Sequence, residues 1–434
     1  MRKVLLIAYF FPPCAEGGVM RARAFSKYLP DYEWQPHVLT VHDEYYLTFT
    51  KDDMLVEELS SRVIIHRTTS FEPKGKIVKN IQATVYGVNR TTNWFERYGK
   101  RFLRFLYRAL AIPDEHILWL PQAVKRGLAV IREQNIDVLF VTTPPHSAAV
   151  IAALLSRLTG KPLIWDVRDD WVDNPLFDAG PWHRHFLMRL LERWIVNHAA
   201  KVVSVTRESV ESFRQRYPNQ PACKFHFIPN GFDQEEIAKV QSKTERPYNT
   251  KMRLVYVGTL GATRTPRALF QALYDLKQSS PLEEQMQVDF YGYARYDFMT
   301  LSQDMGLNDL VTFHGFVSRE ESLRQIILSD VALMIIPEKE GSRTAIPGKL
   351  YEYIGGNKFV LALCPQNSAP ARLINETKAG LIASQHNADE IRQLLSVLID
   401  KYKCGTLNAN LDQQILEQFE RSRLTRKLVE IFER

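Results

Sequence analysis

Long hydrophobic runs are absent from this chain of 434 residues. No stretch reaches the roughly 18 uncharged apolar residues of a membrane-spanning helix, so no segment is expected to cross a bilayer. The apolar stretch at residues 3–9 is short, and Pro12 and Pro13 follow it without a small-residue cleavage site. We therefore interpret it as a buried strand and not as a secretion signal.

Cysteine is also scarce. The chain has only four, at positions 14, 223, 364 and 404, and they form neither a C-x-x-C pair nor a cluster with histidine at metal-ligand spacing. This distribution excludes a disulfide framework and favours the reducing cytosol. No internal repeat or low-complexity tract is present, so extensive disorder is not expected.

The charge balance is basic, with 56 Lys and Arg against 49 Asp and Glu for a net charge of +7. Such an excess suits nucleic acid, an anionic membrane surface or a phosphorylated substrate. No module that interleaves basic and aromatic residues is present, so nucleic-acid binding is disfavoured. The length exceeds what one hydrophobic core usually supports, which predicts two domains.

Short β-rich apolar runs alternate with longer amphipathic segments along most of the chain, which is typical of parallel α/β sheets. Strands are expected at residues 3–9, 34–41, 63–66, 137–142, 162–167, 201–206 and 224–228, and then at 252–257, 287–291, 310–314, 331–336, 358–363 and 380–383. Helices are expected between them at residues 19–29, 121–134, 146–159, 266–277 and 318–328.

This rhythm stops and restarts once. Residues 229–231 (Pro-Asn-Gly) form a turn signal, residues 241–250 are polar, and a new strand begins at Met252. We predict domains at 1–235 and 251–410, with a final helix at 411–434 that is a candidate to pack back on the first domain. Ligands of open parallel sheets bind beyond the carboxyl ends of the strands, so two such domains facing each other would enclose a ligand cleft.

Five loop segments resemble, in order, the motifs of retaining GT-B glycosyltransferases of family four, and most closely those of members that build bacterial surface polysaccharides. These segments are 11–18 with Arg21, 143–147, 228–233, 257–261 and 347–354. The resemblance implies two Rossmann-like domains facing across a cleft. It also implies a nucleotide-diphosphate sugar donor, with UDP favoured over GDP, a retained anomeric configuration and no metal or other cofactor.

The departing nucleotide diphosphate is the strongest chemical demand on such a site, because its negative charge grows in the transition state. Pro347 suits a first helical position, and the amides of Gly348, Lys349 and Leu350 are then predicted to face phosphate oxygens. Glu352 follows one turn later, and the resemblance implies that it binds the ribose hydroxyls. The alternative is an ordinary capped helix with a solvated Glu352.

Other donor contacts are predicted around this helix. Arg264 occupies the position where the family places a basic residue against the diphosphate, with a solvated loop charge as the alternative. Thr259 occupies the companion basic position, and Phe316 and Val317 are predicted to hold the base.

One family position differs in this chain. Many members carry a glutamate where this chain has Thr344. Ser342, Arg343 and Thr344 are the candidates to replace its contact with the donor sugar.

Gly17 and Gly18 are predicted to let the first loop approach phosphate closely. They do not form G-x-G-x-x-G, which disfavours a hydride-transfer enzyme. The resemblance implies that His146 hydrogen-bonds the donor sugar near the reacting carbon, as a neutral imidazole. Asp169 or Asp170 is the candidate to take the acceptor proton, with Asp169 preferred, unless Arg168 and these carboxylates only hold the loop.

Arg97, Arg101, Arg104 and Arg108 repeat at helical spacing among apolar residues. This pattern predicts a basic amphipathic helix that docks on anionic lipid, or else one that packs its apolar face on the sheet.

We therefore expect a cytoplasmic transferase, peripheral to the inner face of the membrane. It would move a sugar to a hydroxyl of a lipid-linked or growing glycan in surface-polysaccharide synthesis. The alternatives are a nucleotide-sugar epimerase on the same fold and a noncatalytic membrane-surface assembly protein.

Overall fold

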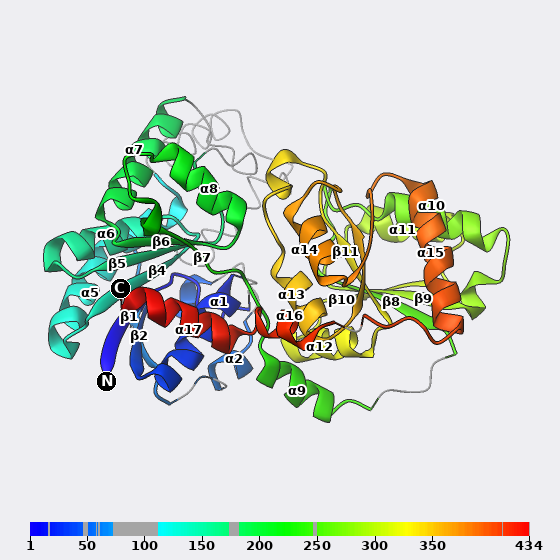
Figure 1. The fold of residues 1–434 in the computed structure, drawn as a ribbon, viewed down its shortest axis with the longest axis horizontal. Coiled ribbons are helices and arrows are strands. Elements are labelled where there is room, and N and C mark those ends of the chain that lie inside the picture. Colours follow the sequence, from blue (N-terminus) through cyan, green and yellow to red (C-terminus); the bar gives the residue numbers. More distant parts are fainter. Residues whose placement is uncertain are drawn as a thin grey trace, which may run out of the picture. The chain divides into compact units, whose positions relative to one another are not determined.

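The computed structural model describes residues 1–15, 18–46, 51–57, 59, 61–72, 112–172, 182–245, 250–409 and 411–433. The chain folds into two compact units (Figure 1). Unit 1 comprises Met1–Pro229 with Thr425–Arg434, and unit 2 comprises Asn230–Leu424. Each unit is built on one parallel sheet with helices on both faces.

Within the described residues, unit 1 has a seven-stranded sheet in the order β3-β2-β1-β4-β5-β6-β7. Its central strands are buried on both faces, so they are apolar almost throughout, and β4 has no exposed residue. The strands are β1 Arg2–Ile7, β2 Trp34–Val41, β3 Ile64–Thr68, β4 Val138–Thr143, β5 Leu163–Val167, β6 Lys201–Ser204 and β7 Phe225–Phe227.

Side chains on one face of this sheet pack against helices α5 to α8. Helices α1 and α17 (Arg421–Phe432) lie on the other face (Figure 1). There Phe140 of β4 lies between Phe25 of α1 and Phe432 of α17, with ring centroids 5.6 and 5.9 Å away. The helices of unit 1 are α1 Val19–Tyr28, α2 Met54–Glu57, α5 Leu120–Gln134, α6 Ser147–Thr159, α7 Trp182–His198 and α8 Arg207–Arg216.

Unit 2 has a six-stranded sheet in the order β10-β9-β8-β11-β12-β13, again counted over the described residues. Helices α10 and α15 cover one face, and α9, α12, α13 and α14 cover the other. The strands are β8 Met252–Val257, β9 Met286–Tyr291, β10 Val311–Gly315, β11 Val331–Ile335, β12 Phe359–Leu363 and β13 Gly380–Ala383. The helices are α9 Gln234–Ser242, α10 Arg267–Lys277, α11 Tyr296–Asp304, α12 Arg319–Leu328, α13 Gly348–Gly355, α14 Ala369–Thr377, α15 Ala388–Lys403 and α16 Gln413–Glu417.

Every strand expected from the sequence is present, and no strand boundary differs by more than two residues. The five expected helices are also present. The predicted fold class, two Rossmann-like α/β domains, is therefore confirmed. None of the helices in the described parts of the chain is long and apolar enough to span a bilayer.

The C-terminal helix differs from the prediction, because it is interrupted. Helix α16 ends at Glu417, and α17 (Arg421–Phe432) starts only after a break. In the break, Phe232 donates its N–H to the Phe419 carbonyl (3.0 Å) and accepts from the Arg421 N–H (2.9 Å). In a continuous helix, the Phe419 carbonyl and the Arg421 N–H would form hydrogen bonds within the helix itself. Their pairing with Phe232 therefore ends one helix and starts the next.

Unit 2 begins at Asn230, before the polar segment that marked the boundary in the sequence. The reason is helix α9, whose Ile237 and Val240 belong to the core formed with α12 and α13. The last residues of the chain belong to unit 1, where Phe432 packs on Trp34 with ring centroids 5.0 Å apart.

A buried ion pair lies at the centre of unit 1. Asp166 of β5 is fully buried, and its carboxylate accepts from Arg21 of α1 (Nη2–Oδ1 2.8 Å) and from the Thr142 hydroxyl (2.7 Å). The Arg21 guanidinium also donates to the carbonyls of Ile228 (3.0 Å) and Pro229 (2.7 Å), just beyond β7. One arginine therefore joins the first helix, the middle of the sheet and its last strand.

Replacing this arginine tests how much the pair stabilises the fold. Arg21→Met is expected to lower the free energy of unfolding of unit 1 by about 3 kcal/mol, because it leaves the Asp166 charge buried without its partner. All seven tryptophans lie between residues 34 and 194, so tryptophan fluorescence during urea unfolding reports on unit 1 alone. Arg62→Met, at the exposed pair with Asp31 in unit 1, is the control and is expected to change stability by less than about 1 kcal/mol. Equal effects of the two variants on the free energy of unfolding would contradict the stabilising role of the Arg21–Asp166 pair.

Candidate functional site

Three glycine turns line the carboxyl edge of the second sheet. Gly258, Gly292 and Gly315 stand at the ends of β8, β9 and β10 with φ of 151°, 117° and 73°. The Gly258 N–H donates to the Tyr291 carbonyl, and the Gly292 N–H donates to the Gly315 carbonyl, both at 2.7 Å. A side chain on Gly292 would collide with the Gly258 backbone, so glycine is required where these turns approach each other. Parallel sheets bind ligands at this edge.

Lys349 reaches the first of these turns from helix α13. Its Nζ donates to the Val257 carbonyl at 2.8 Å. The same Nζ lies 2.8 Å from the position that a Cβ on Gly258 would occupy. The side chain is only partly exposed. The fold thus brings together two of the predicted motifs, the β8 turn and the start of α13, and places a positive charge between them.

The start of α13 is open. Gly348 is exposed, and apart from its own helix and chain neighbours no atom of the described residues lies within 4 Å of where its Cβ would be. Pro347 is the N-cap, with ψ of 137°, and not the first helical residue as predicted. The Leu350 amide also differs from the prediction, because it donates to the Pro347 carbonyl (3.1 Å) while the Leu350 side chain is fully buried. The amides of Gly348 and Lys349 remain as the candidate anion donors.

Arg264 and Thr259 are both exposed in the loop after β8. The Tyr256 hydroxyl donates to the Thr259 carbonyl at 3.1 Å. Burial raises the pKa of Tyr256 to about 12, and the nearby positive charge of Arg264 acts against that rise.

The remaining predicted donor contacts lie on exposed loops or beside the core. Phe316, directly after β10, is 66% exposed, whereas Val317 is partly buried against the core that contains α12 and α13. Arg343 and Thr344 are exposed, and the Arg343 carbonyl accepts from the Ala369 N–H at 2.7 Å.

Glu352 is buried, so the alternative of a solvated carboxylate is wrong. Its Oε1 accepts from Arg319 Nη1 at 2.7 Å, and Arg319 also binds both carboxylate oxygens of Glu236 at 3.2 Å. Burial lowers the pKa of Arg319, but the two glutamates more than offset this effect and raise it. Oε2 of Glu352 has no hydrogen-bond partner in the part of the chain that the structure describes.

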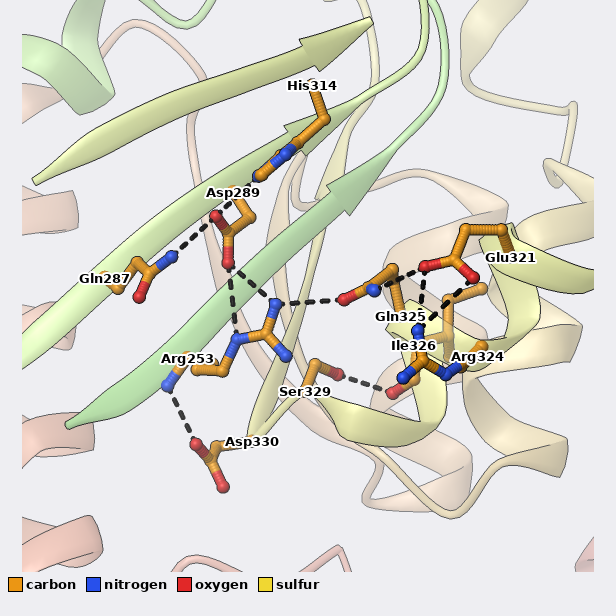
Figure 2. Close-up of polar contacts among 10 residues, drawn as sticks. All are labelled: Arg253, Gln287, Asp289, His314, Glu321, Arg324, Gln325, Ile326, Ser329 and Asp330. Carbon is orange, nitrogen blue, oxygen red and sulfur yellow. Dashed lines mark hydrogen bonds and ion pairs between the residues drawn. The ribbon is translucent and has the colours of Figure 1, made fainter. Parts of the chain in front are cut away.

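A second buried carboxylate, which the sequence analysis missed, lies in β9. Figure 2 shows Asp289 accepting from Arg253 (2.9 Å), Gln287 (2.8 Å) and His314 (2.9 Å). The His314 ring stacks on Tyr291, with centroids 4.2 Å apart and planes 5° apart. The signal was available, because an aspartate inside an otherwise apolar strand needs buried partners. The network holds His314 beside the Gly315 turn.

In unit 1, His146 directly precedes α6 and is buried. Its ring stacks on Trp171, with centroids 4.8 Å apart and planes 4° apart. Burial lowers the pKa of His146 to about 4; the Asp114 charge opposes this shift and the Arg168 charge adds to it. The imidazole is therefore neutral near pH 7, which is the protonation state that the predicted role requires.

Arg168 holds the neighbouring loops through backbone carbonyls. Its guanidinium donates to the carbonyl oxygens of Gly18, Thr143 (3.2 Å) and Pro144. A side chain on Gly18 would collide with this guanidinium, so the glycine makes room for Arg168. The approach of Gly18 to phosphate stays a prediction. Gly17 lies outside the described residues.

Asp169 follows Arg168, and its side chain reaches the surface. Desolvation by the surrounding protein raises the pKa of Asp169, and the negative charge of Asp170 adds to this rise. The positive charge of Arg168 acts against it. Asp170 itself accepts from the Ser209 hydroxyl. Asp169 is thus the more exposed member of this pair.

The predicted basic helix with Arg97, Arg101, Arg104 and Arg108 lies outside the described residues.

The neutral state of His146 has a measurable consequence. The unfolded chain binds a proton at His146 as the pH falls through 6.5, whereas the folded chain resists protonation until about 4, so acid destabilises the fold across this window. We expect His146→Phe, which preserves the stack on Trp171, to lose less stability than the wild type between these pH values. Urea unfolding followed by tryptophan fluorescence measures this loss. His37 and His66 are present in both proteins, so their contributions to the pH dependence of stability cancel. The control is His183→Phe, at an exposed position on α7. An unchanged pH dependence in His146→Phe would contradict the assignment.

Comparison with known proteins supports the same assignment of fold. Residues 79–231 match the family model described as Glycosyl transferase 4-like domain. No curated protein sequence matches the chain.

Three solved structures are similar over nearly the full length of both chains. HepE of Anabaena in complex with UDP is 16% identical with a TM-score of 0.64, and 100% of each chain is covered. Sucrose-phosphate synthase of Thermosynechococcus elongatus is 13% identical with a TM-score of 0.66, covering 100% of this chain and 98% of that one. WaaG, described as a glycosyltransferase involved in lipopolysaccharide biosynthesis, is 13% identical with a TM-score of 0.59 and 99% coverage of each chain. The two units of this protein therefore have the GT-B fold.

Proposed function

We propose that the protein is a glycosyltransferase that moves a sugar from a nucleotide-diphosphate donor to a hydroxyl group. The observation that carries the proposal is the open start of α13, with Lys349 placed between it and the β8 turn. The match of residues 79–231 to a Glycosyl transferase 4-like domain supports it. HepE, which shares the fold, was crystallised with UDP, so we propose UDP rather than GDP as the carrier.

The diphosphate is bound at this edge of unit 2. The amides of Gly348 and Lys349 and the positive end of the helix dipole attract phosphate oxygens. The ammonium of Lys349 and the guanidinium of Arg264 add full charges that stabilise the leaving group as its negative charge grows. These groups neutralise the diphosphate without a metal ion, so we propose metal-independent transfer. We propose retention of the anomeric configuration only because the loop motifs resemble those of retaining glycosyltransferases.

The ribose is bound by Glu352. A buried carboxylate oxygen that lacks a hydrogen bond costs on the order of 1–3 kcal/mol, and a ribose hydroxyl would supply that bond to Oε2. Arg319 holds the other oxygen at 2.7 Å and so orients the free one. Phe316 and Val317 contact the base, and Arg343 and Thr344 are the candidates for the sugar.

The acceptor side is assigned to unit 1. The neutral imidazole of His146 hydrogen-bonds the donor sugar without placing a permanent positive charge beside a developing oxocarbenium ion. Asp169 takes the proton of the acceptor hydroxyl, and its raised pKa is consistent with that role. The acceptor is a lipid-linked or growing glycan of the cell surface, at the inner face of the membrane. WaaG, described as acting in lipopolysaccharide biosynthesis, has the same fold.

Charge removal at the diphosphate site tests donor binding. Lys349→Met and Arg264→Ala are each expected to weaken UDP binding about 10-fold to 100-fold, because each removes one full charge next to a phosphate. Isothermal titration calorimetry measures the affinity. Lys277→Met is the matched control, because Lys277 pairs with Asp309 at the far end of α10, and it is expected to bind UDP like the wild type. Wild-type affinity in both site variants would refute the proposed diphosphate site.

The ribose contact has its own test. The wild type is expected to bind UDP about 10-fold more tightly than the 2′,3′-dideoxy analogue of UDP, because the analogue cannot donate a hydrogen bond from the ribose to a charged acceptor. In Glu352→Gln and Arg319→Met the ratio of the two affinities is expected to fall toward one. A merely structural defect would weaken the binding of both ligands equally and leave the ratio unchanged. Glu376→Gln, at an exposed site on α14, keeps the ratio. An unchanged ratio in both site variants would exclude Glu352 as the ribose ligand.

Product analysis separates the proposed activity from its alternatives. Transfer of labelled sugar from a UDP-sugar to an added glycan acceptor is the expected outcome. Conversion of the donor to its epimer in the absence of acceptor would instead identify an epimerase. Donor binding without any turnover would favour a noncatalytic assembly protein.

A further inference from the structure

Strand β10 carries an irregularity directly before the loop that is proposed to hold the base. Phe313 of β10 pairs with Phe290 of β9. Gly315 pairs with the next residue of β9, Tyr291, so His314 is an extra residue between two ladder partners. Such a β-bulge turns a side chain to a new direction and is frequent beside active sites. The bulge therefore sets the direction of the His314 side chain.

Two contacts hold the His314 ring in that direction. Its Nε2 lies 2.9 Å from Oδ1 of Asp289 (Figure 2). The ring also stacks on Tyr291, with centroids 4.2 Å apart and planes 5° apart. The Asp289 side chain is fully buried, whereas the His314 side chain is 33% exposed. The imidazole is thus fixed from the inside of unit 2 while part of it faces solvent.

The surroundings of Asp289 decide which ring nitrogen of His314 carries the proton. Arg253 Nη2 donates to Oδ2 of Asp289 (2.9 Å), and Gln287 Nε2 donates to Oδ1 (2.8 Å). A carboxylate held in this way only accepts hydrogen bonds, so Nε2 of His314 is the protonated nitrogen. In the neutral ring Nδ1 is then an acceptor, and it forms no hydrogen bond with any residue that the structure describes.

His314 is also one of two anchors of the loop between β10 and α12. The other anchor is Arg319, the first residue of α12, which donates to Glu352 at 2.7 Å. Only residues 315–318 lie between the two anchors, and Phe316 among them is 66% exposed. The loop proposed to hold the base therefore begins at His314 and ends at the residue that orients the proposed ribose ligand.

A fixed acceptor at this place distinguishes two bases of the same size. Uracil has an N–H donor at its ring nitrogen N3, whereas cytosine has an acceptor there. An acceptor of the protein gains a hydrogen bond from the first base and faces a second lone pair in the other. A site built to bind an N–H group in this way rejects a ligand that lacks it.

We propose that Nδ1 of His314 accepts a hydrogen bond from N3–H of uracil and so selects a UDP-linked donor. Asp289 fixes the tautomer, and the stack on Tyr291 fixes the plane of the ring. The inference rests on the proposed function, because it assigns a base contact within the same donor site.

Base selectivity tests the contact. The wild type is expected to bind UDP more tightly than CDP. In His314→Phe, which keeps a ring to stack on Tyr291, the ratio of the two affinities is expected to fall about 10-fold, because the acceptor is lost. Isothermal titration calorimetry at about pH 8, where histidine side chains are ordinarily neutral, measures both affinities. The matched control is His386→Phe, at the other histidine of unit 2, which is exposed beyond β13 and is expected to keep the wild-type ratio.

Nuclear magnetic resonance observes the contact in the wild-type protein. With isotope-labelled histidine, the ring of His314 is expected to carry its proton on Nε2. UDP is expected to move the Nδ1 resonance upfield, as a hydrogen bond to an unprotonated ring nitrogen does, and CDP is expected to move it less. The resonance is identified by its loss in His314→Phe or, if that variant does not fold, in His314→Gln, whose amide still donates to Asp289.

The outcomes separate this contact from the proposed function. An unchanged ratio of UDP to CDP affinity in folded His314→Phe overturns the base contact. A proton on Nδ1, or an Nδ1 resonance that UDP does not move, overturns it as well. In each of these cases UDP binding by the wild type leaves the proposed donor site intact. A wild type that binds neither nucleotide refutes the donor site itself, and the base contact with it.

Discussion

The buried carboxylate of Asp166 is the constraint on which the architecture of unit 1 depends. A charge inside a parallel sheet is tolerated only where fixed donors replace water. Arg21 and Thr142 supply them, and the remaining donors of Arg21 hold the backbone that leaves β7. Two residues further along, Arg168 donates to three carbonyls in two loops. The loop ends around His146 are therefore set by side chains as well as by the sheet.

Unit 2 uses the same principle at two places with different consequences. Asp289 is saturated by Arg253, Gln287 and His314, so its network is complete within the protein (Figure 2). Glu352 is held by Arg319 through one oxygen, while the other has no hydrogen bond in the described residues. A complete network stabilises the sheet, whereas an incomplete one is suited to receive a ligand. This contrast places the proposed ribose contact at Glu352 and not at Asp289.

Much of the fold follows from local patterns. Runs such as Val138–Thr143 are apolar because both faces of a parallel strand are buried, and the strands alternate with amphipathic helices. The resemblance of the loop motifs to those of glycosyltransferases indicated Arg264 and His146, and the predicted helix start after Pro347 indicated Lys349. The break before α17 could not be seen in this way. It depends on Phe232, which is distant in the chain and competes for the backbone groups of 419–421.

The sequence alone determined the two sheets, the order of their strands along the chain and the loops that carry the candidate residues, since hydrophobic periodicity and turn residues act over a few positions. The tertiary structure decided which groups meet: Arg21 with Asp166, Arg319 with Glu352, and Lys349 with the β8 turn. It also decided that the Leu350 amide is already bonded and that His314 pairs with Asp289. The physical reason is that burial and pairing depend on neighbours from other parts of the chain, which no local pattern specifies.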